Sequence, residues 1–450
     1  MSGNIVISIL VVIVMLGLMV TVHELGHYFI ARLLGINAYE VSIFLGPKLI
    51  HWKNKAGVEF TIRAIPFGAY VRFSDIDDDG YIAEHPDNEK ELLNQPRFKR
   101  LLVALAGPAM NVLLSFVMFI ALFAIIGVPT LELDKADEGS PLASSSYTEG
   151  DRLCDINGHS LFTPYDFNFY LNLNYEEDKP TTLGLISQKD NKRYEITLDP
   201  VFMDTRTLGI TFDGRKKGPD GGYMLEIVDS KATYSPELKS GDYLKKIDGV
   251  EVTYEAFADI RESYQDKDSV VMLVNRDGKD IEVTCTPEVK KVPVYPGMEL
   301  KTYQVDSFAN FLKACRYTVR MPVSIAMLSV KTVQAAFDQK VEAYNVVSGP
   351  VGFTENVTAI VDSSLSVKGK ALELLQISAI ISMGLAFTNM LPIPGLDGNQ
   401  LLLLVIEMVT GKKLSEKAEK GLTVVGFACL IVLFLFALSS DIIRIIVEHT

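Results

Sequence analysis

The chain has 450 residues, of which 48% are hydrophobic, and a formal net charge of −13 at pH 7. This length accommodates two or three domains. The acidic balance argues against a nucleic-acid partner, because phosphate binding requires a basic face. The four cysteines form no C-x-x-C pair, so neither a zinc ribbon nor a disulfide framework is indicated.

Four long apolar runs divide the chain. Each has roughly the 17–25 residues that cross a bilayer as a helix. The first run lacks the basic start and the cleavage site of a signal peptide. The sequence therefore predicts a polytopic α-helical membrane protein with about four spans. The runs are Ile5–Val22, Leu101–Val128, Leu374–Pro392 and Leu422–Leu438.

Lysines and arginines near the ends of the spans predict the orientation, because they concentrate in cytoplasmic loops. Arg32 follows the first run, Arg97–Arg100 opens the second, and Gly411–Lys420 lies between the third and the fourth. We therefore expect these segments to be cytoplasmic. Both termini and the long region 130–370 should then be extracytoplasmic.

The loop between the first two runs combines two patterns. Alternating apolar residues with Gly and Pro breaks in Ile36–Phe73 predict short strands. The acidic stretch Asp75–Glu91 is typical of a solvated loop.

An internal repeat marks the extracytoplasmic region. Glu149–Leu161 (EGDRLCDINGHSL) and Ser240–Val252 (SGDYLKKIDGVEV) share the pattern G-D-x-L-x-x-I-[N/D]-G. Two copies of one small β-rich module fit the interval Thr130–Pro287, and they resemble tandem PDZ domains of the bacterial, protease-associated kind. Such domains bind peptides along a strand edge. The alternative is a pair of folded spacers with unused grooves.

The segment Ser307–Phe337 mixes apolar residues with basic ones. A charge in the centre of a span is costly. A basic amphipathic helix on the membrane surface is therefore favoured over a fifth span. The basic residues are Lys313, Arg316, Arg320 and Lys331.

The segment TVHELGHYFI ends the first apolar run. His23 and His27 are four residues apart, so on a helix they share one face and can bind one metal ion. In H-E-x-x-H helices the glutamate, here Glu24, is the general base that takes a proton from a metal-bound water. The alternative is interfacial snorkelling of polar side chains, but ionisable groups at the end of a span usually mark function.

A catalytic zinc ion needs a third protein ligand and an open position for water. The other histidines fall in segments expected to be loops or tails, which favours a carboxylate. Asp397 is the best candidate, because Pro392 and Pro394 must break the third span at the cytoplasmic depth that His23 also occupies. The alternative is a simple turn aspartate. The other histidines are His51, His85, His159 and His449.

These motifs together resemble the site-2 protease family of intramembrane zinc metalloproteases (peptidase family M50), in particular its regulator of sigma-E protease branch. The resemblance covers nearly the whole chain. It rests on HELGHYFIARLLGI, FLGPKL, PFGAYV, AGPAMN, the paired modules, SGPVG and NMLPIPGLDG.

The resemblance implies roles for seven residues. It makes His23, His27 and Asp397 the Zn²⁺ ligands and Glu24 the catalytic base. Substrate binding would fall to Asn389, Pro392 and Pro394. The chain departs from the family pattern after Asp397, where it reads GNQ instead of G-G-H, and in PFGAYV, where two glycines are common. For AGPAMN and SGPVG, close helix packing and a direct part in catalysis both stay open.

The expected function is cleavage of transmembrane segments of single-span proteins in the bacterial cytoplasmic membrane. The resemblance implies truncated anti-sigma factors or remnant signal peptides as substrates. A catalytically silent membrane-anchored PDZ adaptor and a metal transporter are the alternatives. The expected segments are 1–35, first span with HELGH; 36–96, β-rich loop and acidic linker; 97–129, second span; 130–212 and 213–290, PDZ-like domains; 291–373, linker with the surface helix; 374–410, third span with NMLPIPGLDG; and 411–450, fourth span and tail.

Overall fold

The computed structural model describes the chain except for residues 1–2, 77–81, 84–88, 174–175, 177, 218–221, 228–237, 240, 254–256, 295–296, 339–348, 364, 413–414 and 450. It divides into two compact units. One comprises Met1–Val128, Thr302–Thr358 and Ala371–Thr450, and the other comprises Pro129–Lys301 and Ala359–Lys370.

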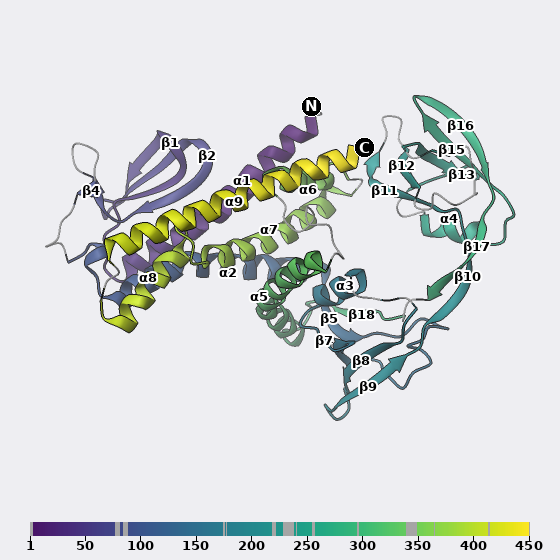
Figure 1. Cartoon of the computed structure of the whole chain (residues 1–450). Coiled ribbons are helices and arrows are strands. Elements are labelled where there is room, and N and C mark those ends of the chain that lie inside the picture. The colour runs from purple at the N-terminus through teal and green to yellow at the C-terminus, as the bar shows by residue number, and fades with distance from the viewer. Residues whose placement is uncertain are drawn as a thin grey trace. The chain divides into compact units, whose positions relative to one another are not determined.

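Four helices in the described residues are long and apolar enough to cross a membrane, which confirms the expectation of about four spans (Figure 1). A helix suits hydrocarbon because it satisfies its backbone N–H and C=O groups internally. The candidate spanning helices are α1 (Gly3–Leu33), α2 (Arg97–Ile126), α7 (Val367–Asn389) and α9 (Glu416–His449). They are accompanied by η1 (Leu92–Asn94), α5 (Phe308–Phe337), α6 (Pro350–Asp362) and α8 (Asp397–Thr410).

The third span breaks where its prolines predict. Helix α7 ends at Asn389, the chain continues without regular structure past Pro392, and α8 begins at Asp397. The interval 374–410 thus contains two separate helices. Pro394 in the break is buried against Gly426 of α9, so close that a Cβ at position 426 would not fit. The break is therefore held between helices.

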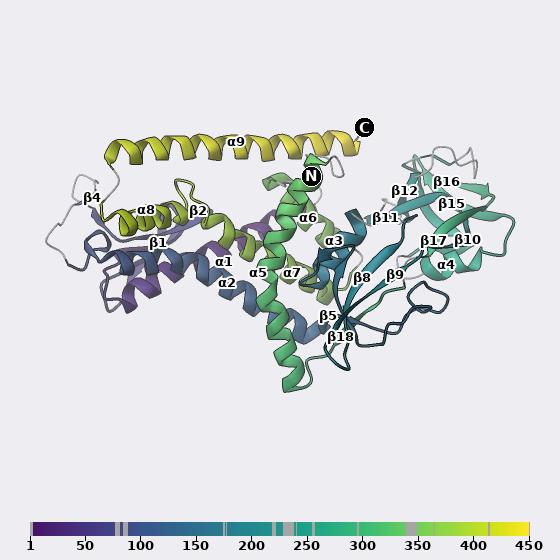
Figure 2. The same ribbon diagram turned by 60° about the horizontal axis from the view of Figure 1, so that its bottom comes forward.

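Helix α2 packs against α1, and Figure 2 shows the two side by side; α2 also bonds to α7 through polar residues. The Ser115 hydroxyl on α2 donates to the Ala379 carbonyl on α7 at 2.7 Å. The Ser382 hydroxyl on α7 donates in turn to the Asn111 carbonyl on α2 at 2.9 Å. Such contacts replace the hydrophobic driving force that lipid cannot supply between helices.

A two-stranded antiparallel sheet, β1 (Glu40–Lys53) with β2 (Glu59–Arg72), follows α1. The strands are longer than the short ones expected, and His51, expected in a loop, lies in β1. Tyr28 of α1 packs in a small core with this sheet. In the acidic stretch 75–91 the structure describes the pair β3 (Asp75–Ile76) and β4 (Ile82–Ala83) and residues 89–91, where Glu91 is buried rather than solvated. The rest of the stretch lies outside the described residues.

The second unit contains two six-stranded sheets with the same order of elements. Each has a strand carrying the repeat motif, a short partner strand, a helix and two further strands, around its own apolar core. The first comprises β18 (Leu300–Tyr303), β5 (Val128–Leu133), β6 (Arg152–Ile156), β7 (His159–Ser160), α3 (Pro164–Leu173), β8 (Thr181–Ile186) and β9 (Arg193–Leu198), and the second β11 (Ile210–Lys217), β12 (Tyr223–Ile227), β13 (Tyr243–Ile247), β14 (Val250–Glu251), α4 (Phe257–Ser263), β15 (Val270–Arg276) and β16 (Lys279–Cys285).

The residues of the repeated sequence motif have the same structural role in both modules. Asn157 and Asp248 adopt positive φ values of 47° and 48° ahead of a glycine, as tight hairpin turns require. Each side chain also accepts a bond from the neighbouring strand, from the amide of Thr182 at 2.7 Å in the first copy and of Val271 at 2.8 Å in the second. The internal sequence repeat therefore corresponds to the same hairpin turn in both modules.

The interval 291–373, expected as a linker, contains strands that belong to sheets of the second unit. Strand β17 (Glu288–Val294) pairs with β10 (Val201–Thr207) as an antiparallel ribbon, and β18 joins the sheet of the first module beside β5. His159, expected in a loop, lies in β7. Helix α5 is not among the four candidate spans of the described chain.

Candidate metal centre

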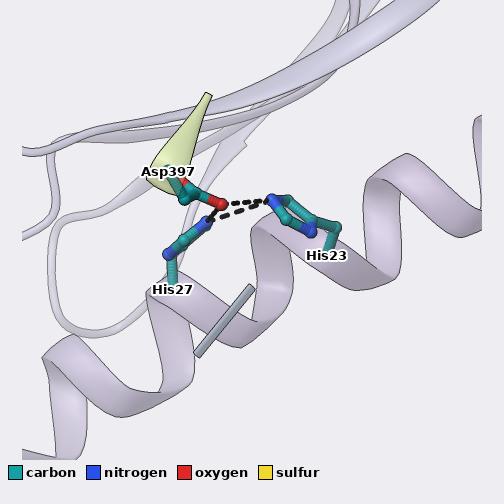
Figure 3. A group of neighbouring side chains, drawn as sticks. All are labelled: His23, His27 and Asp397. Carbon is teal, nitrogen blue, oxygen red and sulfur yellow. Dashed lines mark hydrogen bonds and ion pairs between the residues drawn. The ribbon is translucent and has the colours of Figure 1, made fainter. Parts of the chain in front are cut away.

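Two histidines project from consecutive turns of α1 toward one point (Figure 3). His23 and His27 are only 5% and 7% exposed, and their Nε2 atoms lie 3.3 Å apart. Their placement follows from the four-residue spacing, which superposes side chains on one helix face.

Asp397, the first residue of α8, meets these histidines from the other end of the chain. Its Oδ2 lies 2.9 Å from Nε2 of His23 and 3.3 Å from Nε2 of His27 (Figure 3). The break after Asn389 makes this possible, because it ends α7 and lets a new helix begin with Asp397 at the site. The structure thus brings together the three residues that sequence analysis placed only by membrane depth.

The three side chains fit a zinc ion. Zinc ligands at about 2.0–2.2 Å in a tetrahedron lie about 3.3 Å from one another. The three ligand atoms here are separated by 2.9, 3.3 and 3.3 Å. Two imidazoles and one carboxylate are a donor set that zinc accepts, and three protein ligands leave one position for water.

Glu24 lies beside this cluster. Its carboxylate is close enough to interact electrostatically with His27, His23 and Asp397, and the backbone amide of Val71 in β2 lies within hydrogen-bonding reach of it. A carboxylate held next to a metal position, without occupying it, can move a proton to or from a water. Helix α1, which carries Glu24, also contacts β2.

The three residues expected to bind substrate occupy the break. Asn389 ends α7, and its side-chain amide lies 3.4 Å from Nδ1 and 3.3 Å from Nε2 of His23. Pro392 is exposed, whereas Pro394 is buried. Asn389 therefore lies beside the cluster, Pro392 is accessible in the same break, and Pro394 secures the segment that carries them.

Helix α2 supports the site with residues that sequence analysis did not assign to it. Nδ1 of His27 lies 2.7 Å from the carbonyl oxygen of Val103, which fixes the ring. Gly107, one turn on, must be glycine, because a Cβ there would lie 2.2 Å from Nε2 of His27. Asn111, another turn on, contacts His23. The available signal was AGPAMN, where one asparagine interrupts an apolar span.

The site lies where a helix predicted to span the membrane meets a break in another such helix. Its buried ligand set leaves a position for water and has a carboxylate beside it. This arrangement defines the class of protein as a membrane-embedded metallohydrolase.

Comparison with known proteins gives the family. The family model of Peptidase family M50 matches residues 11–433. Regulator of sigma-E protease RseP from Salmonella typhimurium (strain 14028s / SGSC 2262) and that from Escherichia coli (strain K12) are each 28% identical over 96% of this chain and 98% of their own. A relative from Thermotoga maritima, 26% identical over 94% of this chain and 97% of its own, bears the words zinc metalloprotease in its name.

The chain belongs to peptidase family M50. It is an intramembrane zinc metalloprotease, and zinc is its cofactor.

Proposed function

We propose that His23, His27 and Asp397 hold the zinc ion and that Glu24 is the catalytic base. The observation that carries this assignment is the meeting of three ligand atoms, two from α1 and one from α8, at separations of 2.9–3.3 Å. The zinc ion, when bound, polarises the scissile carbonyl and lowers the pKa of a water at the open position. Glu24 accepts the proton of the attacking water and passes it to the leaving amide nitrogen.

Asn389 binds the unwound backbone of the substrate in this proposal. A peptide bond within a helix has its carbonyl engaged in an intrahelical hydrogen bond, so the substrate must be extended locally before attack. The Asn389 side chain, beside His23, carries both a donor and an acceptor for such a backbone. Pro392 lines the same edge, and Pro394 packs against Gly426 and keeps the segment in place.

The substrates we propose are transmembrane segments of single-span proteins, such as truncated anti-sigma factors or remnant signal peptides. The support is the membrane setting of the site and the names of two relatives, each called regulator of sigma-E protease RseP. Relatives of this name come from bacteria, and the cytoplasmic membrane is the corresponding location. Helix α5 would lie on the membrane surface as a basic amphipathic helix.

The two modules of the second unit are PDZ-like in this proposal and lie on the extracytoplasmic side. Their duplicated turn and shared order of elements support one domain type used twice. They would control access of substrates, or bind extended peptides at a strand edge.

Reconstitution with a single-span model substrate in liposomes tests the assignment. We expect wild type to cut within the transmembrane segment and Glu24→Gln to bind zinc but not cut, because the amide cannot accept the proton. Glu59→Gln is the matched control, since it changes an acid in β2 that pairs with Lys48 rather than with the site. It should cut like wild type.

Two results would overturn the assignment. One is cleavage that persists in Glu24→Gln, and the other is an uncut substrate with zinc-loaded wild type. Both alternatives, the silent adaptor and the metal transporter, predict that second result.

A further inference from the structure

We propose that Asn111 of α2 is a positioning residue that holds His23 in its zinc-binding tautomer. The proposal rests on the proposed function, because it requires His23 to be a zinc ligand. It adds a role for a residue that the sequence left open between helix packing and catalysis.

The contact is direct and fully enclosed. Asn111 has no exposed surface, and its side-chain amide nitrogen lies 3.2 Å from Nδ1 of His23. The amide oxygen is buried too and has no hydrogen-bond partner in the described part of the chain. Burying an amide oxygen without a partner is unfavourable, so its presence calls for an explanation.

The tautomer of His23 supplies that explanation. Nε2 of His23 is the atom that faces Asp397 and His27, so Nε2 must offer its lone pair to zinc. The proton of the neutral ring then resides on Nδ1 and needs an acceptor. A half-turn of the Asn111 amide exchanges its nitrogen and oxygen, which are nearly the same size. The oxygen, which otherwise has no partner in the described residues, then accepts from Nδ1 of His23.

His27 is held in the same manner by the same helix. Its Nδ1 lies 2.7 Å from the carbonyl oxygen of Val103, so the proton on Nδ1 has an acceptor and Nε2 is left for the metal. Val103 and Asn111 are two turns apart on α2, with Gly107 between them opening space for both rings. One face of α2 therefore orients both histidines, one through a backbone carbonyl and one through an amide.

Zinc affinity separates this role from helix packing. The full-length protein is measured by competition with a chromophoric chelator, as wild type, Asn111→Ala, Asn111→Asp and Ser115→Ala. Ser115→Ala is the matched control: Ser115 is also fully buried, lies one turn further along α2 and bonds to α7, not to His23.

We expect Asn111→Ala to bind zinc 10–100-fold more weakly, the usual cost of removing a partner of a ligand histidine. Asn111→Asp should remain within about threefold of wild type, because a carboxylate also accepts from Nδ1. Ser115→Ala should bind zinc like wild type. The visible spectrum of bound Co²⁺ should change in Asn111→Ala and be restored in Asn111→Asp.

The proposal is overturned if Asn111→Ala binds zinc normally, if Ser115→Ala loses as much affinity, or if Asn111→Asp is as weak as Asn111→Ala. The Asp variant keeps the test decisive should the Ala variant fold poorly, because an amide that donates to Nδ1 predicts that a carboxylate, which has no N–H, cannot replace it. His23→Ala separates this outcome from failure of the proposed function. If His23→Ala keeps wild-type zinc affinity, the ligand assignment itself is wrong.

Discussion

Glu407 near the end of α8 forms an ion pair with Arg97 at the start of α2, with Oε1 3.0 Å from Nε. Arg100 approaches the other carboxylate oxygen at 3.4 Å, and Arg97 also donates to the carbonyl of Gly411. These contacts join the far end of the helix that begins with Asp397 to the helix that orients the histidines. Helix α8, which carries Asp397, is therefore also attached to α2 at the end of α8 away from the metal site.

Replacing Glu407 with Gln should loosen α8 selectively. Glu407 is buried, so its loss removes two charge-assisted contacts, and we expect the free energy of local opening to fall by about 1–2 kcal/mol. That corresponds to about 5–30-fold faster amide exchange in α8. Hydrogen exchange followed by mass spectrometry of the detergent-solubilised protein measures it.

The control for Glu407→Gln is Glu195→Gln. Glu195 pairs with Arg193 on the surface of β9, where both side chains are 56% exposed, so exchange there should change less than about twofold. Unchanged exchange in α8 of Glu407→Gln would contradict the structural role of this ion pair.

Gly107→Ala should disrupt zinc binding although it adds only one methyl group. The added Cβ would stand 2.2 Å from Nε2 of His27 and 2.7 Å from Cε1 of His23, and neither ring can retreat without leaving its partners. We expect zinc affinity to fall at least about 10-fold. Gly384→Ala in α7, where a Cβ meets nothing within 4 Å, is the matched control and should keep full affinity. Equal affinities of the two variants would show that α2 does not confine the rings.

The turn of the second module should weaken in acid. Burial alone would raise the pKa of Asp248, but hydrogen bonds from Lys267 and from the backbone of Val271 outweigh it and lower that pKa. A lowered pKa stabilises the fold above the unfolded value, about 3.9, and this stabilisation is lost as pH falls through the folded pKa.

Asp248→Asn isolates this effect, because asparagine already occupies the same turn position in the first module as Asn157. At pH 7 wild type should protect the Val271 amide better than the variant does, by less than about 1 kcal/mol. The difference should shrink as the pH falls below the unfolded value and vanish below the lowered pKa of Asp248. A difference that is constant with pH would contradict the role of the charge.

Much of the membrane architecture could be predicted from the sequence, because the bilayer imposes length and apolarity on every span. The break before Asp397 was also predictable, since two closely spaced prolines cannot continue a helix. The pairing of the histidines followed from their spacing on α1. Their meeting with Asp397 could be expected only by depth, and the structure supplies the lateral contact.

The parts that sequence did not predict depend on which elements become neighbours. Strand β18 enters the first module's sheet through pairing over a long separation, for which no local pattern exists. The carbonyl of Val103 has no side-chain signature at all, since any residue carries that acceptor. Gly107 and Asn111 were visible in AGPAMN, but only the approach of α1 to α2 distinguishes their contacts from ordinary helix packing.

The most direct test of the metal site is zinc stoichiometry by mass spectrometry of the purified full-length protein and its single variants. We predict one zinc ion per chain in wild type and in His51→Ala, whose imidazole pairs with Glu59 in the β1–β2 sheet. We predict loss of that zinc in His23→Ala, His27→Ala and Asp397→Ala. A full zinc ion retained in any of these three variants, or lost from His51→Ala, would contradict the site.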